Sequence, residues 1–558
     1  MRTVLATISR RTFPTRADFP QSGSDWLADL IAGVTVGVVA LPLAMGFGIA
    51  SGVGATPGII TAIVAGFVAA VFGGSNLQVS GPTGAMTVVL LPAVADHGVT
   101  AVPTLAVLAG IMVVLGGWLG LGRAVTFIPW PVIEGFTFGI ATIIFLQQVP
   151  LLVDVTLPPG DHNTLVATTR VLQHATWDVA WPLVVVGGGV MVMMAIIRRV
   201  RPRFPGSLIA IVIATVACWA LNIDAPTIGQ LALSDLVQVP RMPGLGEVGE
   251  LMPAAVIIAL LAALESLLSA RVADGMSDVT PTDPDRELVG QGLANIASGL
   301  VGGLPATGAI ARTAVNARAG ARTRMASAFH GIALLVLLVG ASRVIAYVPL
   351  AALAGVLMMT AINMVERATI RALLRHAGRS TALVFLLTAG TTILFDLARA
   401  VQVGILAAAI LVLRTAAKQS GIEEEAIPPN PNHLDDKEFR ELLDDRVVVY
   451  RLQGSLFFGA AQHFLEELTS LDQARVIVLR LGALHVIDVT GAQVLAETID
   501  DFRQRGIVVL LCRILPRHER MLAAVGIPGS RIDRQLLFTD LSQAVEVARQ
   551  IAADSDPD

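Results

Sequence analysis

The sequence is poor in charged residues and in cysteine. Of its 558 residues only 15% are Asp, Glu, Lys or Arg, whereas a soluble globular protein has about 25%. The two cysteines, Cys218 and Cys512, leave no room for a disulfide framework or a cysteine metal site within one copy, and the nine histidines show no ligand-like spacing. The sequence also lacks a P-loop, a dinucleotide fingerprint and a paired nucleophile and base, so it supports neither an ATP-driven pump nor an enzyme.

The scarcity of charge is confined to one part of the chain. Residues 1–415 contain 24 Arg, no Lys and 20 acidic residues, while residues 416–558 contain 13 Arg, 2 Lys and 23 acidic residues. This contrast indicates two solvents: an integral membrane domain in the lipid bilayer, followed by an acidic soluble domain of ordinary composition. The two net charges, +4 and −8, do not point to nucleic acid as a partner.

Apolar runs punctuated by Gly, Pro and charge predict an all-α polytopic membrane domain of about fourteen segments, several of them too short to cross ~30 Å of hydrocarbon. We expect these segments at residues 27–46, 58–73, 83–95, 103–122, 126–147, 180–197, 204–221, 252–271, 288–302, 307–318, 324–342, 344–363, 380–394 and 398–414. Arginines cluster in alternate connections, which places those loops and both termini in the cytoplasm by the positive-inside rule. Gly and Pro interrupt the third and the tenth segments. That spacing predicts two inverted seven-helix repeats with a binding site near the midplane.

The chain is expected to have four regions. These are a cytoplasmic N-terminal tail at 1–25 without a signal peptide, a transmembrane domain at 26–415, an acidic, proline-rich linker at 416–445 and a small α/β domain at 446–555. In the last region we expect strands at 446–452, 474–481, 507–514 and 535–538, alternating with helices at 460–471, 490–505, 517–525 and 541–552. Asp488 or Thr490 is expected to be the N-cap of the second of these helices.

Two stretches with the same pattern of small residues, Pro and Thr form the candidate anion site. Residues 79–86 read VSGPTGAM, and residues 302–312 read GGLPATGAIAR. If two half-helices point their N-termini at each other, each presents free N–H groups and a partial positive charge, which suits a small anion. Thr83 and Thr307 would add hydroxyl donors, and Arg312 would add positive potential. Tight packing of two kinked helices is the alternative.

Glu265 is the candidate coupling residue. It follows twelve uncharged residues of the eighth segment, where a carboxylate is costly and by default functional. Ser269 lies one turn further on the same helix face, so the pair could hold a sodium ion or exchange a proton. A structural ion pair between Glu265 and Arg312 is the alternative. Glu134 is a weaker candidate, because it lies near the end of its segment, where a charged side chain can reach water.

Taken together, these motifs resemble the SulP family of anion transporters. The resemblance covers essentially the whole chain. It is carried by DLIAGVT at 29–35, LPLAM at 41–45, GGS at 73–75, VSGPT at 79–83, LESLL at 264–268 and ATGAIAR at 306–312. The tail resembles the STAS domain that ends most family members. The resemblance implies a core domain that moves against a gate domain, a homodimer, and a cytoplasmic partner that regulates the STAS domain.

The resemblance also implies roles for individual residues. The substrate-contacting positions of the family match Thr83, Ala306 and Thr307, with Gly308 and Arg312 beside them. Glu265 and Ser269 match the pair that serves sodium in cyanobacterial bicarbonate transporters, where Asp and Thr are usual. A Glu is more typical of members thought to use protons. In the tail, Val489 stands where related proteins carry a phosphorylated serine, which leaves Asp488 and Thr490 as candidate regulatory residues.

We therefore expect a secondary active transporter of a small anion that works by alternating access. The sulfate or bicarbonate class is expected as substrate, with a C4-dicarboxylate as a further option, together with co-transported H+ or Na+ and no cofactor. Three alternatives stay open. The first is an uncoupled anion channel or exchanger, against which Glu265 argues. The second is a nucleobase-type symporter of the same architecture, whose members lack the STAS tail. The third is a purely scaffolding membrane protein, which a measured flux into proteoliposomes would exclude.

Overall fold

A computed structural model of the chain describes residues 15–123, 129–155, 164–201, 204–229, 245–276, 280–376, 378–395, 397–418, 421–424, 446–457 and 474–554. The chain divides into two compact units, Met1–Ile405 and Leu406–Asp558. Each unit is described by itself.

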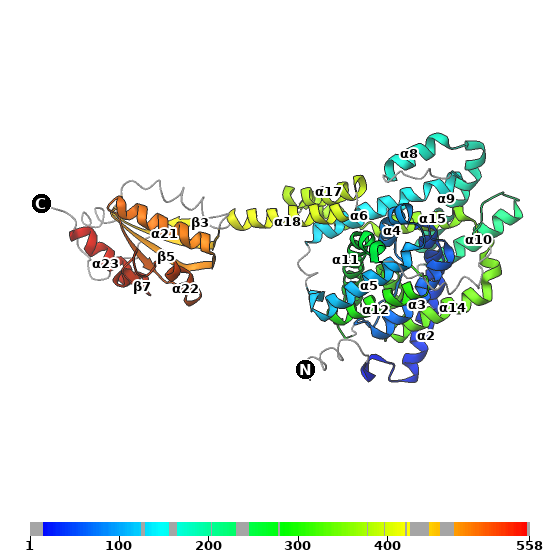
Figure 1. Ribbon diagram of the computed structural model, residues 1–558, viewed down its shortest axis with the longest axis horizontal. Coiled ribbons are helices and arrows are strands. Elements are labelled where there is room, and N and C mark those ends of the chain that lie inside the picture. The colour runs from blue at the N-terminus through cyan, green and yellow to red at the C-terminus, as the bar shows by residue number, and fades with distance from the viewer. Residues whose placement is uncertain are drawn as a thin grey trace. The chain divides into compact units, whose positions relative to one another are not determined.

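The first unit is a bundle of helices (Figure 1). After a short 3-10 helix, η1, at Arg16–Asp18, its helices are α2 (Gly23–Ala50), α3 (Ala55–Phe72), α4 (Gly84–His97), α5 (Ala101–Trp118), α6 (Trp130–Gln147), α7 (Val149–Val153), α8 (Thr164–His174), α9 (Trp177–Val200), α10 (Gly206–Ala220), α11 (Leu245–Met276), α12 (Pro284–Leu300), α13 (Ile310–Arg318), α14 (Met325–Ile345), α15 (Leu350–Met364), α16 (Arg367–His376) and α17 (Arg379–Leu394). Helix α18 (Leu397–Lys418) begins in this unit and ends in the second. In the described residues, eight spans are long and apolar enough to cross a membrane. Each of the fourteen predicted segments coincides with a helix. The short helices α7, α8 and α16 were not predicted.

The third and the tenth segments are broken as predicted, and their non-helical arms pair with each other. The helical parts, α4 and α13, are only 14 and 9 residues long. Before them, β1 (Ser80–Gly81) and β2 (Thr307–Gly308) form an antiparallel ladder with Ser80 opposite Gly308 and Gly81 opposite Thr307. Backbone that is irregular at membrane depth needs such internal partners. Two-residue strands have no detectable periodicity, so the sequence did not reveal the ladder.

The helices of the first unit form two sets that pack mainly within themselves. In the first set, α2 packs against α3 and α14, α12 packs against α3 and α5, and α11 packs against α5 and α13. In the second set, α6 packs against α15 and α17, and α9 packs against α10 and α15. Both broken segments belong to the first set. This division has the form of the core and gate domains that the resemblance implies.

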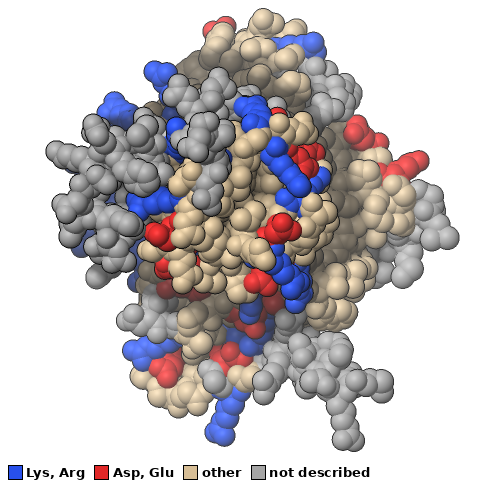
Figure 2. Space-filling model, turned by 90° about the vertical axis from the view of Figure 1, so that its left-hand side faces the viewer, with Lys and Arg blue, Asp and Glu red and all other residues tan. Residues whose placement is uncertain are grey.

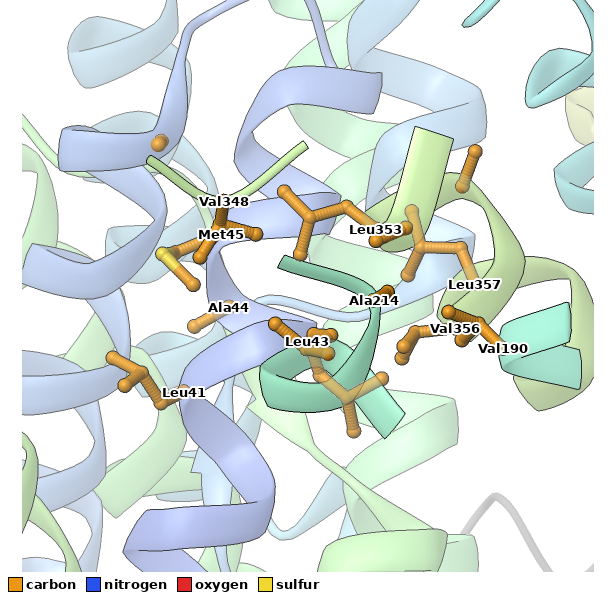
Figure 3. Packing of buried hydrophobic residues seen from close by; sticks show 14 of the residues in the cluster. Leu41, Leu43, Ala44, Met45, Val190, Ala214, Val348, Leu353, Val356 and Leu357 are labelled. Carbon is orange, nitrogen blue, oxygen red and sulfur yellow. The ribbon is translucent and has the colours of Figure 1, made fainter. Parts of the chain in front are cut away.

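An apolar seam joins the two sets. Figure 3 shows Leu43 and Met45 of α2 in one cluster with Val190 of α9, Ala214 of α10 and Leu357 of α15. Apolar contacts are non-directional. The seam is therefore held by packing and not by specific polar bonds.

The second unit holds a five-stranded sheet with helices on both faces. The strand order is β3-β4-β5-β6-β7, and only the β3–β4 pair is antiparallel. The elements are β3 (Gly421–Glu424), β4 (Val447–Leu456), β5 (Val476–Ile487), α21 (Val489–Gln504), β6 (Val508–Cys512), α22 (Pro516–Ala524), a 3-10 turn, η4 (Arg534–Leu536), β7 (Leu537–Phe538) and α23 (Leu541–Asp554). One apolar cluster lies between the sheet and α21 and α22, and another lies between the sheet and α23. Figure 2 shows one face of the protein in space-filling form, on which basic and acidic side chains are interspersed among other residues.

Two expectations for the tail need comment. Residues 421–424 were expected in a linker, but they form the edge strand β3. The strand was not predicted because a short edge strand among charged residues has no alternating pattern of apolar and polar residues. The expected helix at 460–471 and most of the linker lie outside the described residues. The Asp488 cap is confirmed, since its carboxylate accepts a 2.7 Å hydrogen bond from the N–H of Gly491.

Candidate anion site

Glu265 joins the two broken segments. Its Oε2 atom accepts a 2.8 Å hydrogen bond from the Thr83 hydroxyl and a 3.0 Å hydrogen bond from the Thr307 hydroxyl. Glu265 lies on α11, Thr83 directly precedes α4, and Thr307 belongs to β2. Three residues that the sequence singled out from three separate segments thus meet at one carboxylate oxygen.

The N-termini of α4 and α13 are uncapped. Neither N-cap residue gives a side-chain hydrogen bond to its helix. The first carbonyl-bonded N–H groups are those of Thr87 and Thr313. Within the described chain, no acceptor faces the N–H groups of residues 84–86 and 310–312. Such orphan donors carry the partial positive charge of a helix N-terminus, and they favour an anion.

Arg312 brings a buried, partly unpaired guanidinium to the first break. Its Nη2 donates to the carbonyl of Pro82, and its Nη1 has no partner in the described residues. A Cβ atom added to Gly81 would lie 2.5 Å from that Nη1, so the small residue makes room for it. No ion pair within 4 Å links Arg312 to Glu265 among the ion pairs of the described chain, which argues against the purely structural alternative. A buried, unpaired donor of this kind is suited to an anionic ligand.

The other predicted substrate positions are occupied by protein contacts. Ala306 donates its N–H to Asn295 Oδ1 and accepts from Asn295 Nδ2, both at 2.8 Å. Gly308 donates its N–H to Ser266 at 3.0 Å. The backbone amide of Ala306 is thus engaged within the protein, and its fully buried side chain belongs to an apolar cluster with Ala65, Ala69 and Ala294. The roles of Ala306 and Gly308 as substrate contacts stay predictions.

Ser269 lies on the same helix as Glu265 but bonds elsewhere. Its fully buried hydroxyl is 3.0 Å from the hydroxyl of Thr313, which in turn accepts from the N–H of Val79 at 3.1 Å. Ser269 thus contacts the helix α13 rather than Glu265. Glu134 lies on α6 of the second set, is also buried, and forms no hydrogen bond to the site residues within the described chain.

A polar stripe on α12, which the sequence analysis missed, holds both breaks in place. Glu287 accepts from the N–H groups of Gly74 and Ser75 at 2.8 and 2.9 Å. Gln291 donates to the Ser80 hydroxyl at 2.6 Å, and Asn295 binds Ala306 as described above. The sequence does contain a pattern that indicates the stripe, because these polar residues recur every four positions in a segment that is otherwise apolar or small. The stripe fixes the backbone on which the site is built.

Two further contacts border the site. Neither polar atom of the buried Gln78 side chain has a partner in the described residues, and a Cβ on Gly308 would lie 1.7 Å from its Nε2. On the other side, Ile144 of α6 covers the start of α4, since a Cβ on Gly84 would lie 2.1 Å from Ile144 Cδ1. Ile144 is thus the point at which the second helix set reaches the uncapped N-terminus.

Comparison with known proteins identifies the family. Residues 26–388 match the sulfate permease family, and residues 442–544 match the STAS domain. The chain belongs to the sulfate permease family. It is 35% identical to YvdB of Bacillus subtilis (strain 168) over 524 residues, which cover 91% of this chain and 95% of that protein. It is 32% identical to the bicarbonate transporter BicA of Synechocystis sp. over 472 residues, which cover 82% of this chain and 83% of BicA.

Solved structures agree with this assignment. The transmembrane domain of a cyanobacterial BicA matches with a TM-score of 0.60 and 30% identity, covering 69% of this chain and 97% of that domain. The murine anion transporter Slc26a9, in an inward-facing state, matches with a TM-score of 0.81 and 15% identity, covering 98% of this chain and 94% of that one. The likeness to Slc26a9 concerns the fold, and the predicted fourteen-segment inverted repeat with a C-terminal STAS domain fits it. The chain is a membrane anion transporter of this family and not an enzyme, and the nucleobase-type alternative is set aside.

Proposed function

We propose that this transporter carries a small oxyanion of the sulfate or bicarbonate class together with a proton. The observation that carries the proposal is the shared bond of Thr83 and Thr307 to one oxygen of Glu265. While Glu265 is ionised, it occupies both hydroxyl donors and repels an incoming anion. Protonation removes its negative charge and frees the two hydroxyls to donate to the anion. Proton and anion then bind in a mutually favourable way.

Further hydrogen-bond donors beside Glu265 support the proposal. The uncapped starts of α4 and α13 supply backbone N–H donors, and Arg312 supplies an unpaired Nη1. Sulfate and bicarbonate both accept several hydrogen bonds, which suits a site made of many donors. The family description names sulfate, and the relative BicA is a bicarbonate transporter. A C4-dicarboxylate stays a third candidate substrate.

Sodium fits these contacts less well than a proton. A bound metal cation needs several oxygen ligands at once. Glu265 already accepts two hydroxyls through Oε2, and the Ser269 hydroxyl is engaged with Thr313. Sodium would have to gather these oxygens around one point, although Ser269 bonds to Thr313 and not to Glu265, whereas a proton needs only one oxygen of Glu265.

Coupling is needed on energetic grounds. Moving one negative charge inward against an inside-negative potential costs about 2.3 kcal/mol at 100 mV. An uncoupled pathway would let the anion run outward, so accumulation requires a co-transported cation or an exchanged anion.

The deciding experiment is uptake into proteoliposomes that contain the full chain. Radiolabelled sulfate, bicarbonate and succinate are each offered with an inward proton gradient, an inward sodium gradient, or neither. The proposal predicts that the proton gradient drives accumulation of sulfate, or of bicarbonate beyond the amount that enters protein-free liposomes as CO2, and that sodium at equal pH does not. Accumulation driven by sodium alone would contradict proton coupling. Equal flux without any gradient requirement would favour the channel or exchanger.

We further propose that the protein is a homodimer in the cell membrane with both termini in the cytoplasm and that a cytoplasmic partner acts on its STAS domain through Asp488 and Thr490. The native cysteines Cys218 and Cys512 are buried, so a cysteine introduced at the exposed Ala368 reports its own accessibility. A membrane-impermeant maleimide should label it in broken cells but not in intact ones. Labelling in intact cells would invert the proposed orientation.

A further inference from the structure

Helix α16 stands apart from the membrane helices by its composition. It is a ten-residue helix, Arg367–His376, with the sequence RATIRALLRH. Arg367, Arg371 and Arg375 recur every fourth residue, so they form one stripe along the helix. Leu373 lies on another side of the helix and is buried, while Leu374, seven residues after Arg367, borders the arginine stripe and is 47% exposed. The helix is therefore amphipathic, with guanidinium groups beside apolar side chains.

The position of α16 in the chain ties it to the boundary of the membrane domain. It begins three residues after the end of α15 and ends three residues before α17. Both neighbours are helices that coincide with predicted membrane segments. A short helix held at both ends by membrane helices has to lie near the surface of the bilayer, where an amphipathic helix is stable.

Within the residues that the structure describes, the arginines of α16 have no acidic partner. In the described part of the chain Arg367, Arg371 and Arg375 are exposed and form no ion pair. Arg379, at the start of α17, is likewise exposed and forms no ion pair in the described residues. Their nearest acidic residue in sequence, Glu366, accepts a hydrogen bond from the Thr369 hydroxyl at 2.8 Å.

Three arginines beside the first helix set are paired with acidic residues. Arg286 and Arg324 share Asp18 at 3.0 and 2.8 Å, and Arg322 pairs with Asp25 at 2.7 Å. Arg271 of α11 and Arg318 of α13 are exposed and form no ion pair in the described residues, but each is the one exposed arginine of its helix. Helix α16, in contrast, carries three such arginines within ten residues.

A second basic stretch lies beside the first. Arg198, in the last turn of α9, donates to the side chain of Asn363 near the end of α15. This contact brings the exposed Arg198 and Arg199 to the same edge as α16. The open arginines thus come from two separate connections.

We propose that α16, with the end of α9, is a binding surface for anionic phospholipid headgroups. Guanidinium groups bind phosphate oxygens in a bidentate manner, and a basic cluster at a membrane boundary attracts acidic lipids. The exposed Leu374 beside the arginine stripe favours a lipid surface over a soluble acidic protein, because its side chain can enter the acyl region. Bound lipids would hold the second helix set against the bilayer while the first set, which carries the anion site, shifts.

The test compares three variants of the full chain by native mass spectrometry. The first is R367Q/R371Q/R375Q. The second, R367K/R371K/R375K, keeps the charge. The third, R503Q/R520Q/R534Q, removes the same charge from exposed positions of the tail. Each protein is titrated with phosphatidylglycerol and with phosphatidylcholine.

The wild type is expected to bind phosphatidylglycerol in preference to phosphatidylcholine. The Gln variant should bind phosphatidylglycerol about tenfold to a hundredfold more weakly, the Lys variant should fall between it and the wild type, and the tail variant should match the wild type. Equal binding of the two lipids by the wild type would overturn the proposal, as would an unchanged preference in the Gln variant. If the Gln variant keeps its bound lipids but becomes cleavable by protease in its C-terminal region, then the arginine stripe binds the acidic tail. That result would also overturn the proposal of lipid binding.

Discussion

The hydroxyl of Thr83 donates a 2.8 Å hydrogen bond to Oε2 of Glu265, which lies 182 residues further along the chain. The Thr307 hydroxyl donates to the same oxygen. In the mechanism that we propose, the protonation state of this one carboxylate decides whether the hydroxyls of both broken segments are available to an anion.

Replacing either threonine by valine should weaken anion binding. Thr83→Val and Thr307→Val keep the shape of the side chain but remove one donor, at a cost of about 1–3 kcal/mol for each. The apparent affinity in competition uptake should fall by roughly fivefold to a hundredfold. Thr87→Val is the matched control, since this buried threonine on the same helix bonds to Thr83 O at 3.2 Å and not to Glu265. Unchanged affinity in both variants would place the anion elsewhere.

Removing the unpaired guanidinium should have a larger effect than removing a hydroxyl. Arg312→Gln loses the charge and its donors, so binding of sulfate measured by calorimetry should become undetectable or drop by about a hundredfold or more. Arg312→Lys keeps the charge but not the fork of donors, and it should recover part of the affinity. Equal loss in both variants would show that the shape of the fork matters and the charge does not.

The α12 stripe should affect the site through the backbone. Asn295→Ala leaves the N–H and the carbonyl of the buried Ala306 without partners, which costs about 1–3 kcal/mol for each unsatisfied group. Both the thermal unfolding temperature and the anion affinity should fall. Gln173→Ala, at an exposed position of α8, should change neither. If the variant loses stability but keeps full anion affinity, then Asn295 stabilises the fold and does not position the anion site.

The N-terminal tail should stabilise the protein in a pH-dependent manner. Burial raises the pKa of Asp18, but the Thr15 N–H, Arg324 and Arg286 outweigh it and hold the pKa below its usual value. A depressed pKa means that the stabilisation is present above the unfolded-state value, near 3.8, and is lost as the pH falls through the folded-state value. Asp18→Asn should therefore lower stability at pH 7 by about 1.5–3 kcal/mol, with the gap to wild type closing in strong acid. A gap that is constant with pH would contradict the assigned charge.

Part of this structure could be predicted from the sequence because the signals are local. The breaks at residues 79–86 and 302–312 were visible as Gly, Pro and Thr within apolar runs, and Glu265 stood out as a carboxylate in an uncharged helix. The pairing of Ser80 with Gly308 was not visible, because a two-residue ladder carries no periodic pattern. The unpaired state of Arg312 was not visible either, since it depends on where three distant segments pack. β3 was missed because charge in an edge strand looks like a linker.

The most direct measurement for the account is proton-driven uptake of labelled anion by the Glu265→Gln variant. Glutamine keeps the size of the side chain and can hydrogen-bond to Thr83 and Thr307, but it is always neutral. In proteoliposomes with an inward proton gradient, the variant should fail to concentrate sulfate or bicarbonate, while exchange of labelled for unlabelled anion at equilibrium should survive in part. Glu250→Gln, an exposed residue of the same helix, should accumulate the anion as the wild type does. If the Glu265→Gln protein still accumulates anion under the proton gradient, then Glu265 is not the coupling residue and the central claim is wrong.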